Sequence, residues 1–369
     1  MIKNIYYIVL LIFCQVGMAQ QKHQLLEMGD IYLKHNNYAM ATNMYQQYIK
    51  LFPNDTGYYH LGNVLRLQKQ YEEAIINLEK SIHYNKNFQP AYSILGKLYN
   101  EQFDYNTAIM YLDAALKINP NADDYNERGM SYYKLNNFEQ AIDNFDMALG
   151  IDSTLAICYN NRASAKYNNQ NIAKASKADL LNALEDYNKA IAINNKLALS
   201  YRNRAFVYYY LDSLELALNN IEQSIYLYNK DDIAFFCLGL ILYKEKKYSN
   251  ALEAYNQSIF LANYIADSYL ERAKTYLALK DFAHATTDLN QVILFSNELK
   301  GESYLYLAAV AAWQKDKNTM LYNIKKANNQ SLFDDSKYIK YLQEYEAFDT
   351  FKNDADFKKL LNKIKFGKK

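Results

Sequence analysis

A small residue, glycine or alanine, returns along this chain of 369 residues at nearly constant spacing. The intervals are 33, 34, 33, 34, 42, 34, 34 and 35 residues, for the series Gly29, Gly62, Gly96, Gly129, Ala163, Ala205, Gly239, Ala273 and Ala308. A large side chain stands four residues before each of them. The aligned alanine follows twelve residues later in seven copies and twenty residues later, as Ala183, in the fifth. A period of this length predicts an array of stacked repeats.

Each copy of the repeat has the pattern of two helices. Large and small residues lie three and four positions apart in both halves, so they share one face of a helix. The chain has only three prolines and ten glycines, and its long runs of Leu, Ala, Lys, Glu, Gln and Tyr favour helices over strands. Asparagine pairs such as 36–37 and 136–137 are expected in the turns, because asparagine accepts a left-handed backbone. The pattern therefore predicts an all-α fold.

The residue types at these spacings resemble the tetratricopeptide repeat. The unit of that family has 34 residues, with an aromatic residue, a leucine, a small residue, a tyrosine, an alanine, an aromatic residue and a proline at set offsets. The third copy carries Tyr92, Leu95, Gly96, Tyr99, Ala108, Leu112 and Pro120. The resemblance covers about residues 22–329, as eight full copies and a degenerate ninth. It implies a right-handed superhelical solenoid of antiparallel helix pairs with a concave groove.

The first nineteen residues have the pattern of an export signal. Lys3 is followed by an apolar run over 5–13 and by the small-x-small sequence at 17–19. The run is too short to span a bilayer comfortably, which takes about 20 residues. We expect 1–19 to be a cleaved signal peptide, with an uncleaved signal anchor as the alternative. The protein is then expected outside the cytoplasm, periplasmic or associated with the outer membrane of a bacterium.

The rest of the chain is predicted to divide into a repeat array, 20–329, and a C-terminal segment, 330–369. In the fifth copy an insertion of eight residues lies within 168–183. We expect longer helices or a protruding loop there, and a knob that contacts a partner is the alternative. In the C-terminal segment, Phe357, Leu360 and Ile364 have helical spacing among lysines, which predicts helices that cap the array. A membrane-surface helix is the alternative for this segment.

Four copies have an arginine directly before the small residue, where the family usually has leucine: Arg128, Arg162, Arg204 and Arg272. The second helices of the same copies have a partner candidate at a matching position: Asn144, Asp186, Asn220 and Asp288. Antiparallel pairing brings the two positions together, so we predict that each arginine buries its stem and hydrogen-bonds across the hairpin. The alternative is a ladder of arginines that binds an acidic ligand.

The sequence lacks the patterns of the common catalytic and cofactor sites. The 41 basic and 40 acidic side chains nearly cancel, which argues against a nucleic-acid partner. The five histidines are scattered over different copies, and no phosphate-binding loop or nucleophile motif occurs. We therefore expect no enzyme activity, no cofactor and no metal. Cys158 and Cys237 lie two repeats apart, which predicts two buried thiols rather than a disulfide.

The resemblance also implies which first-helix side chains line the groove. The candidates in the fourth to seventh copies are Asn126, Met130, Tyr133, Asn160, Tyr167, Arg202, Phe206, Tyr209, Phe236, Leu240 and Tyr243. Such aromatic and amide side chains can hold an extended peptide or receive a helix.

We therefore predict a non-catalytic scaffold that binds a peptide or helix of a partner protein in its concave groove. A glycan-binding module that stacks sugars on the tyrosines is the alternative. Membrane contact is expected only through an uncleaved signal anchor. Assembly into a homo-oligomer is left open, because the exposed end of an array could pair with a second copy.

Overall fold

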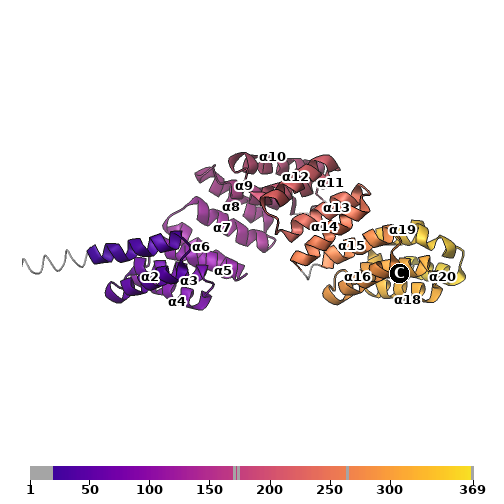
Figure 1. Cartoon of the computed structure of the whole chain (residues 1–369), viewed down its shortest axis with the longest axis horizontal. Helices are drawn as coiled ribbons and strands as arrows, with labels where there is room; N and C mark the ends of the chain where they lie inside the picture. The colour runs from indigo at the N-terminus through magenta and orange to yellow at the C-terminus, as the bar shows by residue number, and fades with distance from the viewer. Residues whose placement is uncertain (1–19, 169–171, 173–174, 263–265, 367–369) are drawn as a thin grey trace, which may run out of the picture. The chain divides into compact units, whose positions relative to one another are not determined.

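The computed structural model of the chain describes residues 20–168, 172, 175–262 and 266–366, and the regular elements in these ranges are helices without any strand (Figure 1). The predicted signal peptide, 1–19, lies outside the described residues. The chain forms two compact units, and the division falls between Asn194 and Asn195.

The first unit begins with a helix over 20–34. It continues with α2 (Tyr38–Leu51), α3 (Asp55–Leu67), α4 (Tyr71–Tyr84), α5 (Gln89–Glu101), α6 (Tyr105–Ile118), α7 (Ala122–Lys134), α8 (Phe138–Ile151), α9 (Ala156–Asn168) and α10 (Lys177–Ile193). The helix over 20–34 pairs with α2, and each odd-numbered helix from α3 onward pairs with the even-numbered helix that follows it. These pairs are the first to fifth hairpins.

The second unit has the same construction. Its sixth to ninth hairpins consist of α11 (Ala198–Tyr210), α12 (Leu214–Leu227), α13 (Asp232–Lys244), α14 (Tyr248–Leu261), α15 (Ala266–Ala278), α16 (Phe282–Phe295), α17 (Lys300–Trp313) and α18 (Lys317–Asn329). The C-terminal elements are η2 (Leu332–Asp334), α19 (Ser336–Glu344), η3 (Glu346–Phe351) and α20 (Ala355–Phe366). The predicted fold class, an all-α solenoid of antiparallel helix pairs, is confirmed.

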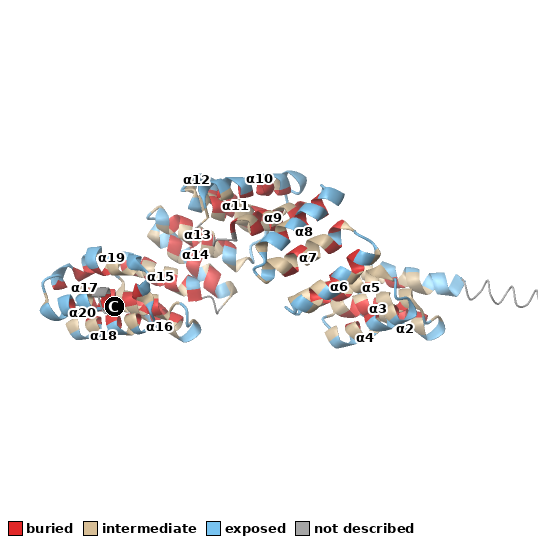
Figure 2. Ribbon diagram, turned by 180° about the vertical axis from the view of Figure 1, so that it is seen from behind, coloured by how far each residue is buried: buried red, intermediate tan, exposed pale blue. Residues whose placement is uncertain are grey.

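The periodic small residues are the points where the two helices of a hairpin approach most closely. A Cβ atom added at Gly129 would lie 2.7 Å from Cε1 of Phe145, and one at Gly62 would lie 2.6 Å from Cγ of Leu78. A larger side chain at either glycine would have to displace the ring or the leucine. Buried residues lie where neighbouring helices of a unit face each other, and exposed residues lie on the outer surfaces (Figure 2).

In every hairpin except the fifth, whose turn lies partly outside the described residues, the turn has one residue with a left-handed backbone. Asparagine takes this place in the first and fourth hairpins, where Asn36 and Asn136 have φ of 57° and 60°. Other hairpins have Lys69, Phe103 or Lys246 there, at φ of 61° to 63°. A left-handed conformation costs such residues roughly 1–2 kcal/mol. The packing of the two helices therefore imposes the turn, and the asparagine prediction is correct for only part of the series.

Part of the insertion in the fifth copy lengthens the second helix. α10 has 17 residues, against 14 in α8 and α12. It begins with a capping box in which Ser176 and Asp179 satisfy each other's backbone N–H groups. Residues 169–171 and 173–174 of the insertion lie outside the described residues, and the contact with a partner stays a prediction.

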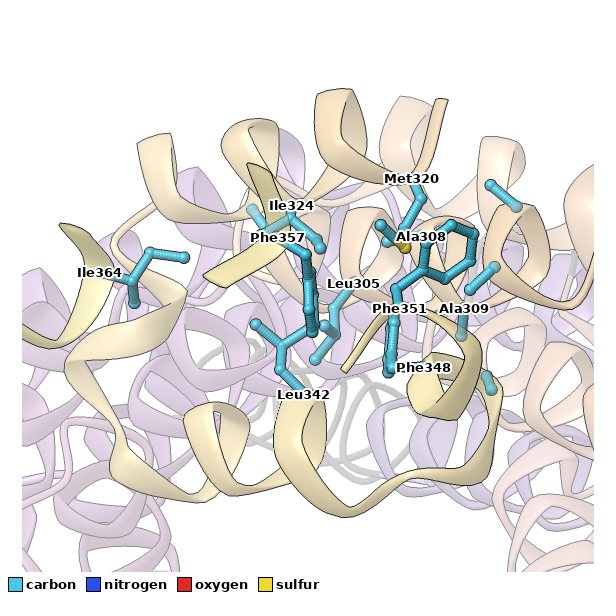
Figure 3. Close-up of a cluster of buried hydrophobic side chains, with 14 of the residues drawn as sticks. Leu305, Ala308, Ala309, Met320, Ile324, Leu342, Phe348, Phe351, Phe357 and Ile364 are labelled. Carbon is cyan, nitrogen blue, oxygen red and sulfur yellow. The ribbon is translucent and has the colours of Figure 1, made fainter. Parts of the chain in front are cut away.

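The C-terminal segment packs on the ninth hairpin. Leu305 and Ala309 of α17 share one buried cluster with Leu342 of α19 and with Phe348 and Phe351 of η3. These side chains converge between the helices of the ninth hairpin and the C-terminal elements (Figure 3). Within the described residues, no helix combines the length and the apolar character needed to cross a bilayer.

The two cysteines of the described chain are both buried and both free, as predicted. Burial raises the pKa of the Cys158 thiol to about 12. The Cys158 sulfur lies 3.5 Å from the backbone oxygen of Phe145. The thiols therefore act as small packed side chains.

Candidate functional site

The four arginines that precede a small residue hydrogen-bond across their own hairpins, as predicted. We call this contact the arginine staple. Nε of the arginine lies 2.8 Å from Asn144 in the fourth hairpin, 2.9 Å from Asp186 in the fifth, 2.7 Å from Asn220 in the sixth and 2.8 Å from Asp288 in the eighth. The donors are Arg128, Arg162, Arg204 and Arg272.

Three of the staples also reach the second helix of the preceding hairpin. Nη1 of Arg162 lies 2.6 Å from Oδ1 of Asp146, and Nη1 of Arg272 lies 2.6 Å from Oδ1 of Asn256. Arg128 pairs with Asp113 in the same way. This contact is not among the predicted ones, although its sequence signal is regular: the acceptor follows the small residue of the preceding copy by 17 positions. Each of these arginines ties two hairpins together.

A tyrosine three residues before each arginine completes the staple. The guanidinium carbons of Arg128, Arg162 and Arg272 lie 5.3 Å from the ring centroids of Tyr125, Tyr159 and Tyr269, and that of Arg204 lies 5.5 Å from Tyr201. A cation over an aromatic face contributes roughly 0.5–1 kcal/mol where it is partly exposed. The recurring Tyr-x-x-Arg sequence is therefore explained by stacking and pairing within the fold.

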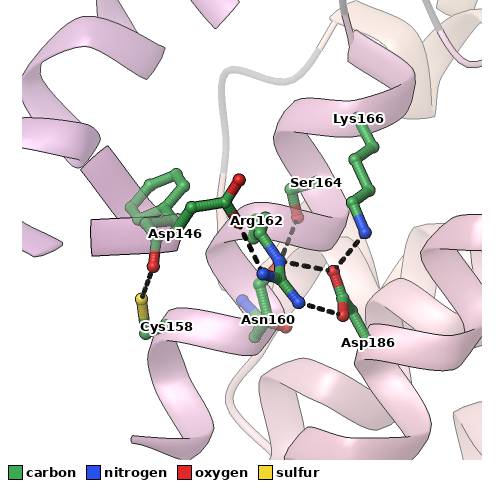
Figure 4. Close-up of polar contacts among 8 residues, drawn as sticks. Asp146, Cys158, Asn160, Arg162, Ser164, Lys166 and Asp186 are labelled. Carbon is green, nitrogen blue, oxygen red and sulfur yellow. Dashed lines mark hydrogen bonds and ion pairs between the residues drawn. The ribbon is translucent and has the colours of Figure 1, made fainter. Parts of the chain in front are cut away.

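The charges of the fifth hairpin show why these arginines are structural. Figure 4 shows Arg162 between Asp146 and Asp186, with Lys166 reaching Asp186 at 2.7 Å. Burial alone would raise the pKa of Asp186, but the hydrogen bonds from Arg162 and Lys166 outweigh it and hold the pKa below its usual value. The side chain of Arg162 is only 16% exposed. The alternative of an arginine ladder open to an acidic ligand is therefore wrong.

The predicted groove residues of the first unit divide into two groups. Asn126, Met130 and Tyr133 are half-buried, but Asn160 and Tyr167 are only 1% and 8% exposed. The hydroxyl of Tyr167 lies 3.1 Å from that of Tyr187 and points into the hairpin. The amide of Asn160 is turned toward Asn161, with 3.3 Å between Nδ2 and Oδ1. Asn160 and Tyr167 are therefore not open contacts, because side chains within the fold attract their polar atoms.

The predicted groove residues of the second unit are all half-buried: Arg202, Phe206, Tyr209, Phe236, Leu240 and Tyr243. Arg202 is engaged by Asp231 of the next hairpin, with Nη1 at 3.0 and 2.8 Å from the two carboxylate oxygens. The remaining five residues form a partly exposed apolar and aromatic surface on α11 and α13. We call these five residues the first-helix surface.

A buried hydroxyl lies beneath this surface without a partner among the described residues. Tyr255 of α14 is fully buried, and its hydroxyl has no hydrogen bond. The equivalent Tyr45 donates to Asp30 at 2.6 Å, and the equivalent Tyr187 lies 2.9 Å from the Ser164 hydroxyl. Both partners directly follow the small residue of the first helix. In the seventh hairpin that place is taken by Leu240, which cannot accept a hydrogen bond.

Electrostatics at this surface favour neutral hydrogen-bonding groups. Burial raises the pKa of Tyr209 and of Tyr243 to about 12, so both hydroxyls stay protonated. Burial also raises the pKa of Glu271 on the neighbouring α15, although Lys274 opposes the shift from 2.7 Å. Tyrosine hydroxyls both donate and accept, which suits the amides of a peptide. Among the described residues, no three His, Cys, Asp or Glu side chains gather as metal ligands would.

Comparison with known proteins agrees with this construction. Three family models, each described as a tetratricopeptide repeat, match residues 26–86, 89–122 and 122–155. The chain is thus built as a scaffold of helical-hairpin repeats. It is a tetratricopeptide repeat protein, and the copies beyond residue 155 follow the same register in sequence and structure.

Solved structures share the fold at low sequence identity. The Cut9-Hcn1 hetero-tetramer of the APC/C matches with a TM-score of 0.59 at 12% identity, over 93% of this chain and 76% of that chain. A tetratricopeptide repeat protein from Parabacteroides merdae matches with a TM-score of 0.54 at 16% identity, over 69% of this chain and 99% of that chain. No curated protein matches the chain by sequence. The likeness therefore establishes the architecture alone.

Proposed function

We propose that this protein is a non-catalytic scaffold that binds a helix or peptide of a partner protein on the first-helix surface of its second unit. The tetratricopeptide repeat fold supports a role in protein–protein interaction. The half-buried apolar and aromatic side chains of α11 and α13 supply the contact area that such binding needs.

The C-terminal segment is the observation that supports this proposal most, because it covers the equivalent positions on the ninth hairpin. Leu305, Ala309 and Ala312 of α17 stand at the register positions that Phe236, Leu240 and Tyr243 hold on α13. On α17 these positions are buried in a cluster with apolar side chains of α19 and η3. On α13 they remain half-buried. A helical segment with leucine and phenylalanine anchors is therefore the expected occupant.

The cellular location of the protein is part of the same proposal. The pattern of residues 1–19 supports export, so the partner is expected outside the cytoplasm, in the periplasm or at the outer membrane. Sequencing the N-terminus of the protein from a fractionated cell tests this directly. Recovery in the cytoplasmic fraction with the first nineteen residues intact would contradict it.

Site-specific crosslinking tests the binding surface. A photo-reactive amino acid at Tyr243 or Phe206 is expected to capture a discrete partner in cells, identified by mass spectrometry. The matched control is Tyr226 of α12, which is 83% exposed and lies outside the first-helix surface. Capture of the same proteins from Tyr226 would show that the first-helix surface is not the site. Peptide and glycan arrays at equal salt distinguish the glycan alternative, which predicts saturable binding to glycans alone.

A further inference from the structure

The seventh hairpin is a gap in the series of arginine staples. Leu238 stands where the arginine stands in four other copies, and Ala254 stands where those copies have asparagine or aspartate. The third hairpin also lacks the arginine, but Tyr111 occupies the space there and stacks on Tyr99 with 5.4 Å between ring centroids. Leucine and alanine together fill much less volume than a paired arginine.

A surface pocket of about 780 Å³ lies at this gap. Its lining includes all four positions of the staple: Phe235 at the position of the tyrosine, Leu238 at that of the arginine, Ala254 at that of its partner and Glu222 at that of the acceptor on the preceding hairpin. Leu218 and Leu242 complete the apolar wall. The pocket therefore keeps the aromatic ring and the acceptor of the preceding hairpin, and it lacks the arginine and the arginine's partner within the hairpin.

The acceptor of the preceding hairpin is present and available. Asp113, Asp146 and Asn256 each accept a hydrogen bond from the arginine of the following hairpin. Glu222 holds the same position on α12, but the following hairpin presents Leu238. Glu222 is exposed, and among the described residues it has neither a hydrogen-bond nor an ion-pair partner.

The charge around the pocket favours a cation. Glu222 and Glu253 both line it, and Lys247 is the basic residue of the lining. The ammonium group of Lys247 lies 2.9 Å from a carboxylate oxygen of Glu245, which pairs its charge. The carboxylates of Glu222 and Glu253 therefore give the pocket a net negative charge, and its apolar lining lies beside them.

We infer that this pocket is a socket for an arginine side chain of another protein. The stem of the arginine packs on Leu218, Leu238 and Leu242, and the guanidinium lies over the Phe235 ring and pairs with Glu222. Arginine suits such a site because its stem is apolar and its planar head both stacks and hydrogen-bonds. Arg128, Arg162 and Arg272 combine the same stacking with the same pairing to the preceding hairpin.

A second copy of the chain has no spare arginine for the socket. The sequence has six arginines, and each of them hydrogen-bonds to another residue of its own chain. The occupant is therefore a different protein with an exposed arginine.

The socket is separate from the first-helix surface. Phe235, Leu238 and Leu242 of α13 share one face by their spacing of three and four residues, whereas Phe236, Leu240 and Tyr243 lie on another face. The socket proposal can therefore fail while the proposed scaffold function stands, and the reverse also holds.

Methyl NMR of the full chain tests the socket with N-acetyl-arginine amide as the probe. The methyl signals of Leu218, Leu238 and Leu242 are expected to shift saturably with this probe. N-acetyl-citrulline amide has the same shape without the charge and is expected to shift them much less. Glu222→Gln is expected to weaken the probe's binding about fivefold, as the loss of one partly exposed ion pair implies. The matched control is Glu215→Gln, an exposed glutamate of the same helix outside the pocket.

Filling the socket from within the chain is the second test. The double variant Leu238→Arg with Ala254→Asp is expected to form a staple in the seventh hairpin, to raise the melting temperature and to abolish the leucine methyl shifts. Absence of saturable shifts, equal shifts from the citrulline probe or binding unchanged by Glu222→Gln would each overturn the socket. Undiminished probe binding by the double variant would overturn it as well.

Discussion

Arg272 and Asp288 face each other across the eighth hairpin through two hydrogen bonds, with 2.8 Å between Nε and Oδ2 and 2.7 Å between Nη2 and Oδ1. Asp288 is 3% exposed, and the guanidinium of Arg272 is the group that compensates its negative charge. The same pairing recurs with asparagine in the fourth and sixth hairpins. A staple between two charges is more costly to break, because removal of one member leaves the other as an unpaired buried charge.

Removal of one member of this pair is expected to destabilise the protein strongly. Arg272→Leu leaves the buried Asp288 without a counter-charge, which costs about 3 kcal/mol of unfolding free energy. Adding Asp288→Ala is expected to restore part of the loss, because the unpaired charge is then gone. Urea unfolding of the two single variants and the double variant measures the coupling. Additive effects of the two substitutions would contradict the staple.

The pairing of Asp186 predicts a loss of stability in acid. Its pKa is held below the usual value in the folded state, whereas in the unfolded chain it is about 3.9. The contribution of this pairing to the free energy of unfolding is therefore complete above the pKa of the unfolded state. It is lost as the pH falls through the lower pKa of the folded state. The urea concentration at the midpoint of unfolding is expected to decrease as the pH is lowered from about 5 to about 3. The Asp186→Asn variant is expected to show a smaller decrease. Equal pH dependence of the two proteins would contradict this account.

The close approach at Gly129 predicts a steric cost for any side chain. Gly129→Ala places a Cβ against the Phe145 ring and is expected to cost about 2 kcal/mol of unfolding free energy. Adding Phe145→Ile is expected to recover part of it, since Ala205 packs with Ile221 in the sixth hairpin.

The control for this substitution lies in the same hairpin. Gly150 of α8 has nothing within 4 Å of an added Cβ atom. Gly150→Ala is therefore expected to stabilise the helix by up to about 1 kcal/mol, in the opposite direction. Thermal melts of both variants measure the difference, and a stabilised Gly129→Ala variant would refute the packing argument.

Two tyrosines in equivalent places are expected to respond oppositely to loss of the hydroxyl. Tyr187→Phe removes a hydroxyl that is paired with Ser164 and Tyr167, and it is expected to cost about 1 kcal/mol. Tyr255→Phe removes a buried hydroxyl without a partner, and it is expected to stabilise the protein by about 1 kcal/mol. Denaturant midpoints of both variants test the contrast. A destabilised Tyr255→Phe variant would show that the hydroxyl is satisfied in solution.

Contacts within one hairpin were largely predictable from the sequence. The small residue, the large residue opposite it and the arginine with its partner lie within one repeat period, so their spacing alone brings them together. Arg128 and Asn144 are an example: sixteen positions apart, they meet because two antiparallel helices have only one register that pairs Gly129 with Phe145. The repeat thus fixed the fold class and the staples.

Contacts between hairpins were much less accessible to sequence reasoning. The pairing of Arg162 with Asp146 and the covering of Leu305 by the C-terminal segment both depend on how separate elements pack. The spacing of residues within a repeat does not determine the distances between residues of different elements. The rotamer of a long side chain also decides which neighbour its polar end reaches. For the same reason the pocket beside Leu238 is visible only in the structure.

The sequence by itself determined that this protein is a series of helical hairpins, because the contacts that make each hairpin are local and repeat with the chain. The tertiary structure alone decided which polar and apolar side chains remain available to a partner. Which side chains remain available depends on the contacts between one hairpin and the next. Those contacts decide which side chains are buried or hydrogen-bonded, and they follow from three-dimensional packing.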